Sequence, residues 1–110
     1  LPLCFAASGA ALVLYQMGGG AMPNHPMMPA INPTVVSPFL YVTGNALAYS
    51  RSPDNFDFDS SAIMTKAAPI DDEGERLLDH LIDIASGTFT KMETLDYAEQ
   101  LEVFMEGPVL

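Results

Sequence analysis

Apolar residues in this chain gather in short runs between polar turns, and two runs have the character of buried strands. One covers residues 39–42, an unbroken run of aromatic, leucine and valine side chains that follows Pro38 and is closed by Thr43, Gly44 and Asn45. The other covers residues 11–17 and ends in three glycines. Continuous apolar strands are typical of a parallel sheet covered on both faces.

A third stretch alternates instead of running continuously. In residues 54–61, Phe56 and Phe58 alternate with Asp57 and Asp59. In a strand, this pattern predicts both rings on one face and both carboxylates on the other. Between the apolar run at residues 39–42 and this third stretch, residues 46–51 predict two helical turns that stop before a proline.

Residues 71–86 carry the clearest helical pattern, with carboxylates crowding the positive end of the helix dipole and Gly87 at the expected C-terminal position. One apolar stripe predicts a one-sided helix lying on a sheet; its members are Leu77, Leu78, Leu81, Ile82 and Ala85, flanked by Ile84. Residues 91–97 predict a weaker helix, and residues 101–105 could form an edge strand. Strands and helices in this order predict an α/β fold: a small, mostly parallel, Rossmann-like sheet with helices packed on it.

Length and composition bound the size and the partners of this fold. The chain has 110 residues, of which 49% are hydrophobic and 16% charged, so we expect one ordered domain over residues 1–110. The net charge of −10 repels nucleic acid and anionic lipid, and we expect neither as a partner.

A single cysteine, Cys4, excludes an internal disulfide, and we interpret it as a buried apolar residue of a cytoplasmic protein. Residues 1–15 carry no charge and are too short to span a membrane. We interpret them as a core segment, and the chain as the carboxy-terminal piece of something longer.

Several polar positions are candidates for chemistry. The glycines Gly18, Gly19 and Gly20 would let backbone N–H groups approach an anion, although a flexible connector explains them equally well. Because ligands of open α/β sheets bind beyond the carboxyl ends of strands, the other candidates for substrate binding are Thr43, Gly44 and Asn45.

Carboxylates and imidazoles give fewer candidates. Asp57 and Asp59 are the best acids; with Asp54 they could hold a divalent cation, but a solvated acidic loop fits the pattern better. His25 has the character of a surface loop residue. We expect His80 to be solvated on the polar side of its helix.

Residues 18–34 form a long connection that contains four prolines, which favour an ordered loop. Its methionines, Met22, Met27 and Met28, predict packing against a neighbouring domain or a second protomer.

Four segments in the same order resemble the carboxy-terminal domain of the altronate/galactarate dehydratases. Residues 9–23 stand where that family has a strand and the glycine-rich turn FTTGRGTP, and residues 38–45, PFLYVTGN, are similar to PTIKVTGN. Residues 54–63 are similar to the family's DDIDINAG segment, and residues 73–93 to its acidic helix ending ASGxxTKxE. The resemblance covers nearly the whole chain.

This sequence departs from the family's pattern at positions that bear on which substrate it would bind. Met17 and the three glycines replace Thr-Gly-Arg-Gly, so the threonine and arginine of that turn are missing. Ser60 and Ser61 replace the last two residues of INAG, including its glycine. If the missing arginine pairs with a substrate carboxylate, these changes suggest a divergent member that acts on another hydroxy acid or a sulfonated analogue.

The resemblance implies a hydro-lyase that removes water from a sugar acid to give a 2-keto-3-deoxy acid. It also implies a divalent iron or manganese ion, which we expect to bind outside this fragment, together with the amino-terminal remainder as a partner. The fragment alone would be nearly inactive. The alternative is a ligand-binding or oligomerisation module without chemistry.

Overall fold

The fold is built on a three-stranded parallel sheet. A computed structural model describes residues 2–17, 34 and 36–94. The strands β1 (Val13–Met17), β2 (Phe39–Thr43) and β3 (Phe58–Asp59) lie in the order β1-β2-β3, with β2 in the centre. The predicted α/β class with a parallel sheet is therefore confirmed.

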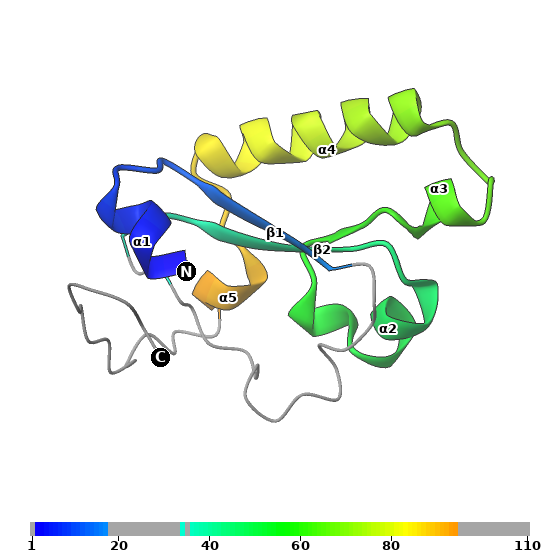
Figure 1. The fold of residues 1–110 in the computed structure, drawn as a ribbon, viewed down its shortest axis with the longest axis horizontal. Coiled ribbons are helices and arrows are strands. Elements are labelled where there is room, and N and C mark those ends of the chain that lie inside the picture. Colours follow the sequence, from blue (N-terminus) through cyan, green and yellow to red (C-terminus); the bar gives the residue numbers. More distant parts are fainter. Residues whose placement is uncertain (1, 18–33, 35, 95–110) are drawn as a thin grey trace, which may run out of the picture.

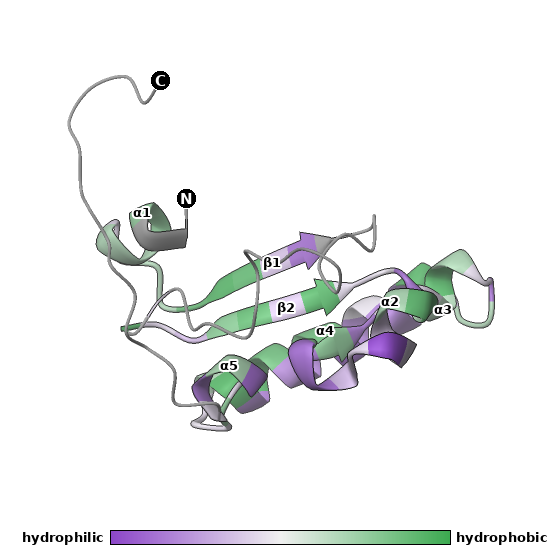
Figure 2. Cartoon of the chain, turned by 90° about the horizontal axis from the view of Figure 1, so that it is seen from below, coloured by the Kyte–Doolittle hydropathy of each residue, from purple (hydrophilic) through white to green (hydrophobic). Residues whose placement is uncertain are grey.

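Helices lie on both sides of this sheet (Figure 1). Helix α4 (Ile70–Ala85) lies on one side, while α2 (Ala46–Arg51) and α5 (Lys91–Thr94) lie on the other. The short helices α1 (Pro2–Ala7), η2 (Pro53–Asn55) and α3 (Ser61–Met64) precede β1, β3 and α4 respectively. Hydrophobic residues are concentrated in β1 and β2 (Figure 2).

Both faces of the central strand, β2, are buried. All five residues of β2 are buried, and Phe39, Leu40 and Val42 are 1% exposed or less. On the α2 and α5 side the core consists of Val13, Phe39, Tyr41, Ala48, Phe56 and Met92. The rings of Phe39 and Tyr41 meet edge to face with centroids 4.7 Å apart. Both predicted strands are confirmed.

The prediction that Phe56 and Phe58 share one face is wrong. Phe56 belongs to the core beside Tyr41, whereas Phe58 packs against Arg76 and His80 of α4 on the opposite face. The reason is local: after the 3₁₀ turn of Pro53–Asn55, Phe56 is extended, but the chain bends at Asp57 before β3 begins at Phe58. Period-two alternation holds only where the backbone is a strand.

The predicted helix on the sheet is confirmed as α4, but its buried side differs from the predicted stripe. Glu73 and Ile84 are buried, whereas Leu78 and Ile82 are 56% and 54% exposed. The side of α4 that faces the sheet, marked by Glu73 and Ile84, is therefore rotated away from the centre of the apolar stripe. Leu78 and Ile82, on one flank of the stripe, remain exposed to solvent.

Two sequence signals fix the end of α4 and the start of α5. Gly87 adopts a φ of 109° and follows the C-cap, and the N–H of Thr88 donates to the carbonyl of Asp83 at 3.1 Å, which is a Schellman motif. Thr90 and Glu93 form a capping box, each side chain accepting the other's backbone N–H at 3.2 and 2.7 Å.

The expectation of a buried core segment at the amino terminus is wrong in part. Cys4 is a free, exposed cysteine in α1, and Phe5 is 49% exposed. Val13 is the residue of this region that enters the core. The cause is geometric, because α1 contacts β1 only at the margin of the sheet.

Some predictions fall outside the described residues. These are the glycine run 18–20, His25, the three loop methionines, the end of the helix predicted over 91–97 and the strand predicted over 101–105. Among the helices described, none has both the length and the apolar character needed to cross a bilayer.

Two glycines, Gly74 inside α4 and Gly87 just after its end, allow a matched test of stability. Gly87→Ala forces a side chain into the left-handed region and should lower the free energy of unfolding by about 1 kcal/mol. Gly74→Ala, inside the helix where an added Cβ meets nothing within 4 Å, should raise it by about 0.5–1 kcal/mol. Urea unfolding measures both, and equal signs for the two variants would contradict this assignment of the helix end.

Candidate functional site

The carboxyl ends of the three strands meet at one edge of the sheet. Met17 pairs with Thr43, and Thr43 pairs with Asp59, so the last residues of β1, β2 and β3 stand in one row. This edge is where ligands of α/β sheets bind. The residues after Met17 lie outside the described part of the chain, and the role predicted for Gly18, Gly19 and Gly20 stays a prediction.

The turn after β2 is held by its own side chains. The Thr43 hydroxyl accepts the N–H of Asn45 at 3.1 Å, and the Asn45 side-chain oxygen accepts the N–H groups of Leu47 and Ala48 as the N-cap of α2. Thr43 is 1% exposed. These bonds give Thr43 and Asn45 structural roles; substrate binding by them and by Gly44 stays a prediction.

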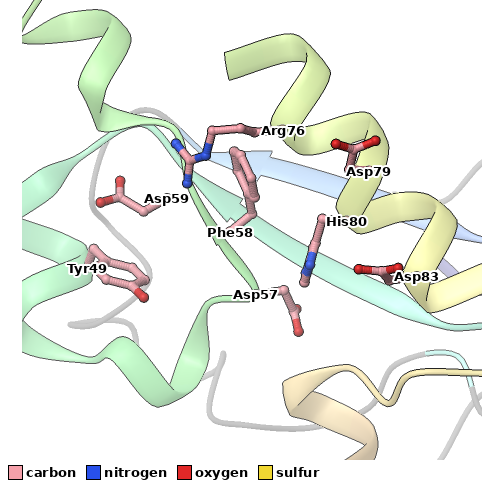
Figure 3. Close-up of a pocket in the computed structure, with 8 residues that line it drawn as sticks. All are labelled: Tyr49, Asp57, Phe58, Asp59, Arg76, Asp79, His80 and Asp83. Atoms are coloured by element: carbon pink, nitrogen blue, oxygen red, sulfur yellow. The ribbon is translucent and has the colours of Figure 1, made fainter. Parts of the chain in front are cut away.

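A polar cavity of about 400 Å³ lies between α4, β3 and α2 (Figure 3). It contains the two predicted acids and adds residues from α2 and α4. Its lining consists of Tyr49, Asp57, Phe58, Asp59, Arg76, Asp79, His80 and Asp83. Four carboxylates and one guanidinium make this wall rich in hydrogen-bond acceptors.

Asp57 is a structural clamp as well as a wall of the cavity. One carboxylate oxygen accepts the N–H of Tyr41 at 2.8 Å, and the other accepts the N–H of Lys91 at 2.6 Å. Burial raises the pKa of Asp57, although the two backbone N–H groups and His80 act in the opposite direction. Burial also raises the pKa of the neighbouring Tyr41 to about 12, so that phenol stays neutral.

Asp59 is the freer of the two acids. Its Oδ1 atom makes a local contact, accepting the N–H of Ser61 at 2.9 Å. The Ser60 hydroxyl in turn donates to the carbonyl of Thr43 at 3.0 Å, which fixes the end of β3 against β2. Asp59 therefore has a fixed backbone and a side chain at the cavity wall.

Arg76 is the cation of this cavity, and two contacts hold it. It pairs with Glu73, which is 3% exposed, and its guanidinium carbon lies 5.2 Å from the centroid of the Phe58 ring. The Arg76 side chain is nevertheless 60% exposed, so N–H donors remain available on the cavity side.

The expectation that His80 is solvated is wrong in part, because the residue is half-buried. Its ring lies 6.0 Å from that of Phe58 and points from α4 toward Asp57 (Figure 3). Its Nε2 atom is buried and has no hydrogen-bond partner among the described residues. The helix is rotated so that position 80 faces β3, which the apolar stripe alone did not indicate.

No group of three or more His, Cys, Asp or Glu side chains in the described part of the chain could hold a metal ion. The carboxylates of the cavity therefore do not fit a divalent metal as a set.

The domain is a parallel α/β sheet with a polar cavity beside β3, its edge strand. The comparisons give the family. Residues 3–109 match the description "D-galactarate/Altronate dehydratase, C-terminal", and the chain belongs to this family. No curated protein and no solved structure matches the chain.

Sequence reasoning found Asp57 and Asp59 but missed Tyr49, Arg76 and His80. The spacing of Glu73 and Arg76, three residues apart on a helix, is a local signal for an ion pair. No local sequence pattern indicates that Arg76 lies over Phe58, because that contact depends on how α4 crosses the sheet.

The raised pKa of Asp57 predicts a pH dependence of stability. A carboxyl group with a raised folded pKa contributes stability below the unfolded value, near 3.8, and this contribution is lost as pH rises through the folded pKa. As the pH rises from about 3.8 through the folded pKa, the free energy of unfolding of the wild type should therefore decrease relative to that of Asp57→Asn. A carboxyl-carbon NMR titration measures the folded pKa of Asp57 directly. A midpoint for Asp57 at or below 3.8 would contradict the prediction.

Proposed function

We propose that this chain is the carboxy-terminal domain of a sugar-acid hydro-lyase and that the cavity of Figure 3 contacts the hydroxy-acid substrate. The observation that carries the proposal is the combination of the family match over residues 3–109 with one arginine in an acceptor-rich wall. The reaction is loss of water from a polyhydroxy acid to give a 2-keto-3-deoxy acid.

The chemistry of the wall suits a polyhydroxy acid. Carboxylate oxygens of Asp57 and Asp59 can accept hydrogen bonds from substrate hydroxyls. The guanidinium of Arg76 can donate two parallel hydrogen bonds to a carboxylate, the interaction expected of the arginine that the glycine run lacks. Asp59, whose side chain is less engaged than that of Asp57, is the better candidate for proton transfer.

We place the divalent metal, iron or manganese, outside the described residues, together with the amino-terminal partner of this domain. Reactions that leave negative charge on the substrate need positive charge nearby, and this chain has four Lys and Arg residues in total. Of these, Arg76 lines the cavity. The domain therefore contributes substrate binding and needs the rest of the enzyme for turnover.

A second candidate is a ligand-binding or oligomerisation module without chemistry. It is favoured by the backbone bonds of Asp57 and Asn45, which account for their side-chain oxygens without a substrate. The full-length protein separates the two candidates. We expect it to release a 2-keto-3-deoxy acid, detected with semicarbazide, when Fe²⁺ or Mn²⁺ is added. Failure on a broad panel of hydroxy acids with metal present would favour the module.

The single arginine that lines the cavity predicts a preference for substrates with one carboxylate over substrates with two. With one arginine at the cavity, a second carboxylate would face Asp57, Asp59, Asp79 or Asp83 without a positive partner. We therefore expect kcat/KM for altronate, with one carboxylate, to exceed that for galactarate, with two, by about 10-fold or more. Steady-state rates of the full-length enzyme measure this ratio. A preference for galactarate would contradict the assignment of Arg76 as the main carboxylate contact.

Arg76→Lys tests the carboxylate contact directly. Lysine keeps the charge but not the two parallel donors, so KM should rise by about 10-fold while kcat changes little. The matched control is Arg51→Lys in α2, which is exposed and does not line the cavity. Equal effects of the two substitutions would argue against a substrate contact at Arg76.

A further inference from the structure

A second cavity, which shares only Phe58 with the polar cavity of Figure 3, lies between the sheet and the first half of α4. Its volume is about 200 Å³. Gln16 and Val42 are the paired next-to-last residues of β1 and β2, and Ser60 directly follows β3. All three line this second cavity, so it lies at the carboxyl ends of the strands, where ligands of parallel sheets bind.

The walls of the second cavity are mostly apolar. Val42 and Phe58 line it from the sheet, Ile63 from α3, and Ile70 and Leu77 from α4. Ile70 is 67% exposed, so in the described part of the chain the cavity can be reached from solvent. Since an apolar cavity of about 150 Å³ is large enough to bind benzene, this one has room for a ligand body of about six carbon atoms.

Glu73 lines the second cavity and carries an unused hydrogen-bond acceptor. The residue is 3% exposed, and its Oε1 atom pairs with Arg76. Its other oxygen, Oε2, is buried and has no hydrogen-bond partner among the described residues. Because a buried acceptor without a partner costs free energy, a ligand that donates a hydrogen bond to Oε2 would be favoured.

We propose that the second cavity binds a small uncharged alcohol, whose carbon body lies against the apolar wall and whose hydroxyl donates to Glu73 Oε2. The ligand is uncharged because Arg76 already balances the Glu73 carboxylate, so an added cation would be buried without an opposite charge of its own. An anion is disfavoured as well, because no lysine or arginine is among the described residues that line this cavity. The inference therefore concerns a ligand other than the hydroxy acid and does not depend on the proposed function.

Three probes that share a six-membered carbon ring test the class of ligand. Cyclohexanol carries a hydroxyl donor, cyclohexanone carries only an acceptor, and cyclohexylammonium carries a charged donor. The amide resonances of Ser60 and Gly74, which line the second cavity, report binding in an NMR titration. We expect cyclohexanol to bind at least about 10-fold tighter than either of the other two probes.

Matched variants test the role of the Glu73 carboxylate. Glu73→Met keeps an unbranched side chain but removes the acceptor, so it should weaken cyclohexanol by about 10-fold or more and leave cyclohexanone unchanged. Glu75→Met removes an exposed carboxylate of the same helix that does not line the cavity, and it should change neither affinity. Circular dichroism checks that each variant is folded, and the comparison of the three probes on the wild type needs no variant.

Three results would overturn the proposal. Equal affinities for cyclohexanol and cyclohexanone, or for cyclohexanol in the wild type and in a folded Glu73→Met, would mean that no donor reaches Glu73. Tighter binding of cyclohexylammonium than of cyclohexanol would assign the cavity to cations. Unchanged resonances of Ser60 and Gly74 with all three probes would mean that the cavity does not accept a ligand of this size.

Discussion

The fold and the candidate site depend on the hydrogen bonds of the Asp57 carboxylate. Its two oxygens accept the N–H of Tyr41 in β2 and the N–H of Lys91 in α5. The Asp57 N–H donates to the carbonyl of Tyr41 at 2.8 Å, so backbone and side chain both fasten this point to β2. A two-residue strand is short for a sheet, and these added bonds explain how β3 keeps its register.

From that register the geometry of the cavity follows. Once Phe58 is paired with Val42, its ring lies under α4 and supports Arg76 and His80. Glu73 then holds the guanidinium from the first turn of the same helix. This pairing offsets part of the cost of burying Glu73, whose other oxygen, Oε2, is buried without a hydrogen-bond partner among the described residues. Among the described residues, Arg76 is the lysine or arginine that lines the cavity, and one ion pair and one aromatic ring position it.

Sequence patterns predicted the elements whose signals are local. The apolar runs of β1 and β2 and the acidic start and Gly87 end of α4 were sufficient to place them. The failures have two kinds of cause, a local bend in the chain and the tertiary surroundings of a side chain. Phe56 and Phe58 lie on opposite faces because the chain bends at Asp57 before β3 begins, and His80 is half-buried because α4 is rotated toward that strand. The Thr90–Glu93 capping box is a further local signal, and it marks the start of α5.

This arrangement connects the family assignment to a physical role for the domain. A cavity wall with one arginine and several acceptors suits the hydroxylated acid proposed as its ligand. This wall depends on β3 and α5 being fastened to β2 at Asp57. Amide hydrogen exchange in Asp57→Ala measures this fastening. The account predicts faster exchange at the N–H groups of Tyr41 and Lys91, by about 10-fold or more, with the Val13 N–H, bonded to Pro38, less affected. Wild-type exchange rates at Tyr41 and Lys91 would contradict it.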